Sequence, residues 1–388
     1  MQFGGSAGVT GTPLVAKYTF GTSLWGLAII GMTGPLIYTV TCLALRSFKG
    51  RMRTDAIAIT GVVIAGLTYV AAVWSTQTWH LVVACAGQGV GTALYWPMIE
   101  AFIARGTTGR KVSLRMGVFN ISWSLGDAAG TAMGGFFFDL YPMLPFITMG
   151  LAVIPVAAVV IAAMRQPEEN GGANGGEDGE GEGPADGATN DGFRKGAWTG
   201  NFIAAGVTNI LRSVFAAPAL DVFRMSGSTY GLVVGTFNAT RTLTFYAMSR
   251  WHSWRYKART FLAVNGLLAV GMAAVVAAAY MPHAVGVAVV FISFAAAGVG
   301  SGMTYFSSIF YTVDTHTEAE TTTPIHEAVL GAGGAIAAIA AGVTNQLASD
   351  PLSPLAMCVV VVAVGMGISA RCMRGQPRRD ESRRDESP

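Results

Sequence analysis

Charged side chains lie inside long apolar stretches of this 388-residue chain, among them Glu100, Asp127, Arg212, Asp221, Arg241 and Glu327. A charge removed from water is costly, so it usually faces a partner or a water-filled path. A buried arginine can bind an anion, and a buried carboxyl group can pair with that arginine or carry a proton. These residue types indicate binding and movement of a charged solute rather than covalent catalysis.

Two polar stripes accompany these charges at helical spacing. One stripe holds Asn201, Thr208 and Arg212, and the other holds Asn120, Ser124, Asp127 and Thr131. We expect Arg212 to be the main anchor for a small organic anion, with Arg241 as a second. The other candidate substrate-binding residues are Thr208, Asn209, Asn120 and Tyr95.

Asp127 and Glu100 are the candidates for proton coupling or for an ion pair. Asp127 should lie within reach of Arg212 or Arg241, because an unpaired carboxylate at that depth would be costly. The alternative is that Asp127 and Arg212 only neutralise one another. For Glu100 and Glu327, which lie near the ends of their stretches, the alternative is anchoring of loops.

The sequence lacks the residue patterns that metal binding and ATP hydrolysis require. The four cysteines form no CxxC pair and the five histidines have no ligand spacing, so we expect no metal site. No GxxxxGK[ST] loop is present, which argues against an ATP-driven pump. We expect no enzymatic activity, no cofactor and no nucleic-acid partner.

The elements that must position these charges are apolar stretches of about 20 residues, the length of a transmembrane helix. There are eleven: 22–45, 56–74, 80–104, 114–138, 144–164, 199–222, 228–249, 260–280, 284–312, 325–347 and 353–371. The chain is 52% hydrophobic and only 12% charged, and the stretches do not alternate as barrel strands would. The sequence predicts an all-α, polytopic membrane protein.

Lys and Arg in the connecting segments predict the orientation. Six segments on one side hold nineteen basic residues, and those on the other side hold two, Lys17 and Arg224. The basic side is therefore expected to be the cytoplasm, with the C-terminus on it, in a multi-pass protein of the cell (inner) membrane.

Residues 165–198 form an acidic, glycine-rich segment that cannot repay the entropy of ordering, so it is expected to be a disordered cytoplasmic linker. It separates a bundle of five stretches (22–164) from a bundle of six (199–371). A charged cytoplasmic tail (372–388) follows. Residues 1–21 are short and polar, and are expected to be an extracytoplasmic segment.

Two sequence features occur in both halves of the chain, but in the first half each lies one apolar stretch earlier than in the second half. The basic run "RSFKGRMR" follows the first stretch of the first half, and "RWHSWRYKAR" follows the second stretch of the second half. The glycine-rich runs "GDAAGTAMGG" and "GAGGAIAAIAAG" are displaced likewise. A six-helix unit used twice, with its first helix absent from the first copy, explains this. We accordingly expect Met1 to be an internal start or the gene to be truncated.

This six-plus-six pattern resembles the major facilitator superfamily of secondary transporters. The resemblance rests on the basic loops "LALRSFKGRMR" and "YAMSRWHSWRYK", on the run from Arg110 to Gly135, and on the two-half hydropathy. It implies a two-bundle fold of about eleven transmembrane helices with a central path. Gly126, Gly130 and Gly134, spaced every four residues, are expected to pack against 228–249. Gly331 and Gly334 are expected to pack in the same way.

The function that this implies is secondary active transport of a small solute by alternating access, as a monomer in the lipid bilayer. The coupling ion would be H⁺ or Na⁺. The alternative is a non-transporting membrane scaffold or sensor, or a truncated gene product. The substrate, the coupling ion and the direction of transport do not follow from the sequence.

Overall fold

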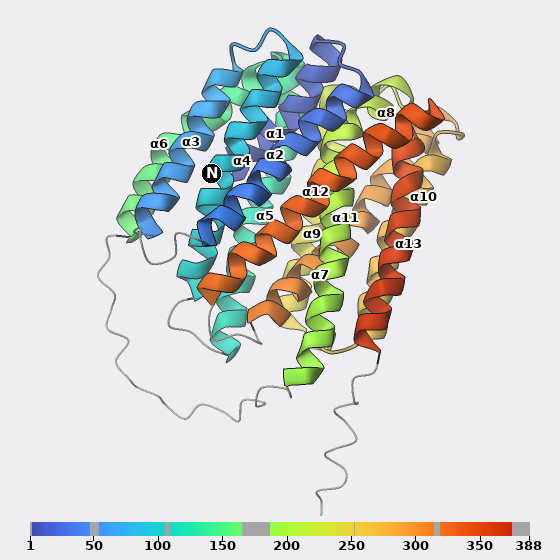
Figure 1. Cartoon of the computed structure of the whole chain (residues 1–388). Coiled ribbons are helices and arrows are strands. Elements are labelled where there is room, and N and C mark those ends of the chain that lie inside the picture. Colours follow the sequence, from blue (N-terminus) through green and yellow to red (C-terminus); the bar gives the residue numbers. More distant parts are fainter. Residues whose placement is uncertain are drawn as a thin grey trace, which may run out of the picture.

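The computed structural model describes residues 2–46, 54–104, 109–164, 187–251, 253–313 and 319–374. These segments are helical, with no strand among the described residues, which confirms the all-α class. The helices form two groups that follow the two halves of the sequence, blue to green and green to red in Figure 1. We call the end at which α8 lies the upper end, and the end at which α13 finishes the lower end.

The first half contains α1 (Gln2–Leu14), the π-helical turn η1 (Val15–Thr19), α2 (Leu24–Arg46), α3 (Thr54–Ala72), α4 (Thr78–Ala104), α5 (Gly109–Leu140) and α6 (Leu144–Met164). The second half contains α7 (Gly187–Asn209), the π-helical turn η2 (Ile210–Val214), α8 (Ala216–Asp221), α9 (Gly227–Arg250), α10 (Ala258–Ala278), α11 (His283–Val313), α12 (Ala319–Ala348) and α13 (Ser353–Met373). All eleven apolar stretches coincide with helices. The stretch 199–222 is divided among α7, η2 and α8.

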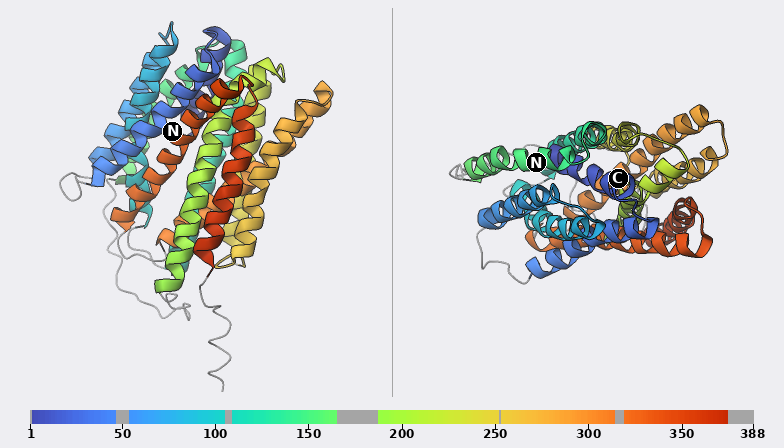
Figure 2. Two further views of the ribbon diagram at one scale, coloured as in Figure 1. Left: turned by 45° about the vertical axis from the view of Figure 1, so that its right-hand side comes forward. Right: turned by 90° about the horizontal axis from the view of Figure 1, so that it is seen from above.

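Two helix pairs make the most extensive contacts between the bundles, α5 with α9 and α2 with α12. In Figure 2, α12 crosses beside α2. Both contacts depend on glycine residues, which have no side chain to separate the helices. A Cβ atom on Gly135 would lie 2.1 Å from the Gly227 carbonyl oxygen, and one on Gly331 would lie 2.4 Å from Thr39 Oγ1. The bundles therefore meet backbone to backbone at α5–α9, and at α2–α12 the Gly331 backbone meets both the Thr39 side chain and the Pro35 carbonyl group.

The N-terminal residues differ from our expectation. The sequence predicts a short extracytoplasmic segment at residues 1–21, but residues 2–19 are helical (α1 and η1) and pack against α5 and α6. The N-terminus lies part-way along the bundle (Figure 1). Small residues make this helix look polar in sequence, and the same residues let it fit tightly: a Cβ on Gly8 would lie 2.5 Å from the Tyr69 ring.

The glycines of α5 also have a different partner from the one expected. Gly126, Gly130 and Gly134 face α1 and not α9, since a Cβ on Gly130 would lie 2.1 Å from the Phe3 carbonyl oxygen. The contact with α9 belongs to Gly135, one residue further along the helix. The four-residue spacing predicted a close helix contact correctly, but it could not name the helix.

The linker is shorter than expected. Helix α7 begins at Gly187, so 187–198 are helical, whereas 165–186 lie outside the described residues. Phe193 is buried and its ring centroid lies 5.4 Å from that of Tyr256 and 5.6 Å from that of Tyr311. This aromatic contact explains why the helix extends beyond its apolar stretch. The charged tail also lies mostly outside the described residues, which end at Arg374.

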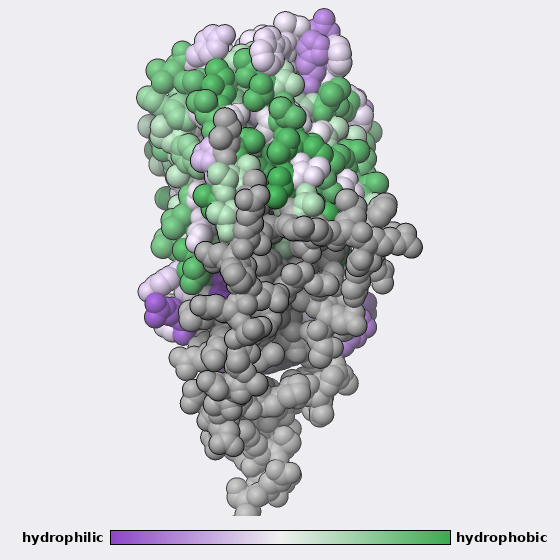
Figure 3. Space-filling model, turned by 90° about the vertical axis from the view of Figure 1, so that its left-hand side faces the viewer, coloured by the Kyte–Doolittle hydropathy of each residue, from purple (hydrophilic) through white to green (hydrophobic). Residues whose placement is uncertain are grey.

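Apolar side chains cover the outer surface of the bundle. Figure 3 shows a hydrophobic band below hydrophilic residues at the top. Leu67, Leu151 and Ile292 are among the exposed large hydrophobic residues, at 64%, 71% and 70%. By length and composition alone, five of the described helices could cross a membrane. With charges inside and apolar groups outside, this surface suits lipid and not water.

Candidate functional site

A cavity of about 360 Å³ lies between the two bundles. All six helices of the first half, α1 to α6, line it, together with α7, η2, α9, α11 and α12 of the second. Five of the charged residues singled out in the sequence reach it: Glu100, Asp127, Arg212, Arg241 and Glu327. Asp221, at the end of α8, pairs instead with Lys17 at 2.8 Å.

Asp127 is the centre of a charged cluster in this cavity. Its carboxylate is fully buried and accepts hydrogen bonds from Arg212 and from Arg241, the latter at 2.5 Å. Ser6 of α1 donates to the other carboxylate oxygen at 2.5 Å. The pairing of Asp127 that we expected is thus present, and it includes both arginines. Two guanidinium groups and one carboxylate leave one uncompensated positive charge.

The two arginines are held by different means. Arg212 lies in the π-helical turn η2, and such turns are frequent at functional sites. It donates to Asn238 Oδ1 at 3.0 Å. Arg241 lies over the Trp123 ring, 4.8 Å from its centroid, a favourable arrangement for a cation. The Nε groups of both arginines are buried without a hydrogen-bond partner.

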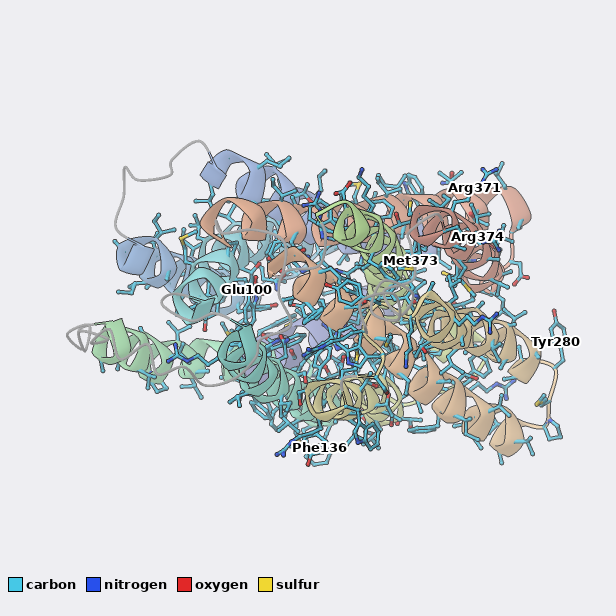
Figure 4. All side chains as sticks on the ribbon, turned by 90° about the horizontal axis from the view of Figure 1, so that it is seen from below. Glu100, Phe136, Tyr280, Arg371, Met373 and Arg374 are labelled. Atoms are coloured by element: carbon cyan, nitrogen blue, oxygen red, sulfur yellow. The ribbon has the colours of Figure 1, made fainter. Side chains whose placement is uncertain are left out.

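A second cluster in the cavity is acidic. Glu100 of α4 and Glu327 of α12 are buried, at 2% and 5% exposure. Tyr305 donates to Glu100 at 3.4 Å, and Tyr38 donates to Glu327. Viewed from below, Glu100 lies among the helices, whereas Phe136 and Tyr280 lie at the edge (Figure 4). The loop-anchoring alternative for these two carboxyl groups does not fit their burial.

Not every predicted residue reaches the cavity. Thr208 and Asn209 line it beside Arg212 and Arg241. The Asn209 amide, however, donates to the carbonyl oxygens of Gly31 and Gly334 at 2.8 Å each, so it joins the bundles. Asn120 and Tyr95 are not among the lining residues.

Asn120 and Tyr95 contact neighbouring aromatic residues and not the cavity. Asn120 is buried and accepts a hydrogen bond from Trp123 Nε1 at 2.9 Å, so it orients the indole beneath Arg241. The Tyr95 ring packs on Trp96, with centroids 5.2 Å apart. Both lie one step away from the cavity and support residues that line it.

Sequence reasoning missed several lining residues, namely Ser6, Tyr38, Trp96, Trp123 and Tyr305. Ser6 was not predicted because residues 1–21 were expected to be an extracytoplasmic segment. The aromatic residues carry no charge and resemble ordinary helix-surface residues in sequence. Among the described residues no His, Cys, Asp and Glu cluster could hold a metal ion.

The same arrangement of helices occurs in known proteins. The crystal structure of a bacterial homolog to the human lysosomal transporter Spinster, in an inward-facing and unoccupied conformation, is similar with a TM-score of 0.66. The two sequences are 15% identical, and the match covers 97% of this chain and 95% of that chain. No curated protein matches the sequence. The family model for the Major Facilitator Superfamily matches residues 2–343.

The chain belongs to the Major Facilitator Superfamily. It is therefore a membrane transporter and not an enzyme, and it handles a small-molecule solute. In this transporter the cavity lies where the two halves of the superfamily fold meet.

Proposed function

We propose that this protein is a secondary active transporter of a small organic anion. The observation that carries the proposal is the Arg212–Asp127–Arg241 cluster, which lies in the cavity and has one positive charge in excess. The unpaired Nε–H groups of Arg212 and Arg241 are buried donors that a ligand oxygen would satisfy. A carboxylate fits both needs.

The cavity supports a compact solute. Its volume of about 360 Å³ falls near the lower end of common ligand pockets. Trp96, Trp123 and Tyr69 supply aromatic walls, and Thr208 and Ser301 supply hydroxyl groups. A small carboxylate with an apolar or aromatic body would match these walls.

Alternating access is the mechanism that the bundle arrangement supports. The cluster joins α5 of one bundle to η2 and α9 of the other, so an anion bound there would contact both. An anion that neutralises the excess charge would weaken the hold of Asp127 on the arginines and so favour rearrangement. In this proposal the lower end faces the cytoplasm of the cell (inner) membrane, and transport is coupled to H⁺ or Na⁺.

Uptake into proteoliposomes tests the proposal. A panel of radiolabelled monocarboxylates and dicarboxylates should include at least one that the purified protein accumulates. Arg212→Ala should lower the apparent affinity for it about 10- to 100-fold, the loss expected for a charge-assisted hydrogen bond. Arg371→Ala is the matched control, because Arg371 lies at the exposed end of α13.

Two outcomes of the uptake experiment would contradict the proposal. If Arg212→Ala transports the accumulated carboxylate as well as the unchanged protein does, then Arg212 is not in the site. If no anion in the panel is accumulated but a neutral or cationic solute is, the anion assignment is wrong.

A further inference from the structure

The carboxyl groups of Glu100 and Glu327 meet across the boundary between the bundles. Glu100 belongs to α4 of the first half and Glu327 to α12 of the second, and the two lie within hydrogen-bonding reach of each other. Their tyrosine partners also cross the boundary, since Tyr305 lies on α11 and Tyr38 on α2. Four side chains thus connect the bundles at this point.

No cation neutralises this pair among the described residues. The titratable and charged groups that face it are Tyr38, Cys42, Tyr305, His326 and Arg241. Arg241 is already bonded to Asp127. His326 Nε2 lies 3.7 Å from Glu327 Oε1, beyond hydrogen-bond distance. Two buried carboxylates side by side would repel strongly.

The hydrogen bonds of the two carboxyl groups leave one carboxyl oxygen of Glu327 without a partner among the described residues. Glu327 accepts from Tyr38 with Oε2, whereas its Oε1 is buried and has no partner. Glu100 accepts from Tyr305 with Oε1. Two acceptor groups that face each other repel unless a hydrogen or a cation lies between them.

We propose that Glu100 and Glu327 form a proton-binding site, in which one proton held between the two carboxyl groups joins the bundles. This site is separate from the arginine cluster and does not depend on which solute is carried. With the proton in place, the pair carries a single negative charge and a hydrogen bond. Without it, two negative charges face each other across the boundary.

A proton fits this position better than a sodium ion. A metal cation needs several oxygen lone pairs directed at it. Here both tyrosine hydroxyl groups direct their hydrogens at the carboxyl groups. The ring centroids of Tyr305 and His326 lie 5.8 Å apart, so aromatic groups occupy part of the remaining surroundings.

A short hydrogen-bonded chain of the second bundle ends next to the pair, at His326. Asn201 Nδ2 donates to Ser308 Oγ at 3.0 Å, and Ser308 lies 2.9 Å from His326 Nδ1. Ser308 can accept from Asn201 and still donate its own hydrogen to Nδ1. His326 then carries its hydrogen on Nε2, the atom nearest to Glu327. At 3.7 Å from Glu327 Oε1, this nitrogen needs a small movement before it can exchange a proton with the pair.

Infrared spectroscopy of the purified, full-length protein tests the site without any solute. At neutral pH in choline chloride, the unchanged protein should show the C=O band of a protonated carboxylic acid, and Glu100→Gln/Glu327→Gln should lose it. Tyr305→Phe should shift the band without removing it, because the acid loses one hydrogen bond. Asp350→Asn, in the turn between α12 and α13, is the control and should leave the band unchanged.

Two results would overturn the proposal. One is a spectrum in which the double variant and the unchanged protein have equal carboxylic-acid bands. The other is loss of the band when NaCl replaces choline chloride at the same pH, which would assign the site to Na⁺. If the double variant does not fold, the shift in Tyr305→Phe decides, and its absence counts against the site. A failure to find a transported anion would leave these spectra unaffected.

Discussion

Asp127 is bonded to three side chains from three different helical segments, η2, α9 and α1. Its two arginine contacts were predictable, since charges at a similar depth in an apolar bundle have few other partners. The contact with Ser6 was not, because nothing in the sequence indicates that α1 reaches it. For the same reason the stacking of Arg241 on Trp123 could not be anticipated: stacking depends on which helix faces are adjacent, and hydropathy does not encode that.

The first prediction concerns the order of stability among variants of this cluster. Asp127→Asn leaves two buried arginines without a countercharge and should cost about 3–5 kcal/mol of unfolding free energy. Arg212→Ala should cost less, because Asp127 keeps Arg241. Thermal unfolding of the detergent-purified proteins measures both. If Arg212→Ala proves the less stable of the two, the charge balance assigned to the cluster is wrong.

At the scale of elements, hydropathy located the eleven apolar helices, because a helix in lipid needs a continuous apolar run. It failed at α1, where Gly4, Gly5, Gly8 and Gly11 interrupt any such run. This helix is enclosed by protein and not by lipid, so its residues were selected for close packing. A scale that rewards apolar side chains cannot detect a helix of this kind.

The second prediction follows from the contact of α1 with α5. Gly130→Ala would place a methyl group 2.1 Å from the Phe3 carbonyl oxygen, and overpacking of this kind costs about 1–3 kcal/mol. Gly367→Ala on α13 is the matched control, since its Cβ would meet nothing within 4 Å. Replacing glycine there should be neutral or stabilising by about 0.4–1 kcal/mol. Melting temperatures that move in the same direction for both variants would contradict the packing.

At the scale of the whole molecule, three contacts hold the bundles together at the upper end. They are the ion pair of Lys17 with Asp221 at 2.8 Å, the bond of Tyr18 to the Met225 carbonyl oxygen at 2.7 Å, and the bonds of Asp139 to the amides of Gly227 and Ser228 at 3.0 and 2.8 Å. Asp139 lies at the end of α5 and caps the first turn of α9. Ser226 caps α9 from within its own bundle, and Asp139 adds to this cap from the other bundle.

The third prediction is that Asp139→Ala opens the upper end. Loss of a helix cap costs about 0.5–2 kcal/mol, which would shift the balance between open and closed forms about 2- to 30-fold. Cys85, which lines the cavity, is the reporter in a Cys372→Ser background, because Cys42 and Cys358 are buried. A bulky, hydrophilic maleimide should label Cys85 faster in the variant. Asp350→Ala, at the same end but within one bundle, should leave the labelling rate unchanged, and an equal rate in all three proteins would refute the role of Asp139.

The position of Trp123 has an optical consequence. The indole lies directly beneath the Arg241 guanidinium, and its Nε1 is fixed by Asn120. A full charge at 4.8 Å imposes a strong local electric field on the ring, and indole emission responds to such fields. Any event that moves Arg241, whether a solute binding or a bundle shifting, changes that field. The protein therefore contains its own fluorescent indicator of what happens in the cavity, and no dye needs to be attached to read it.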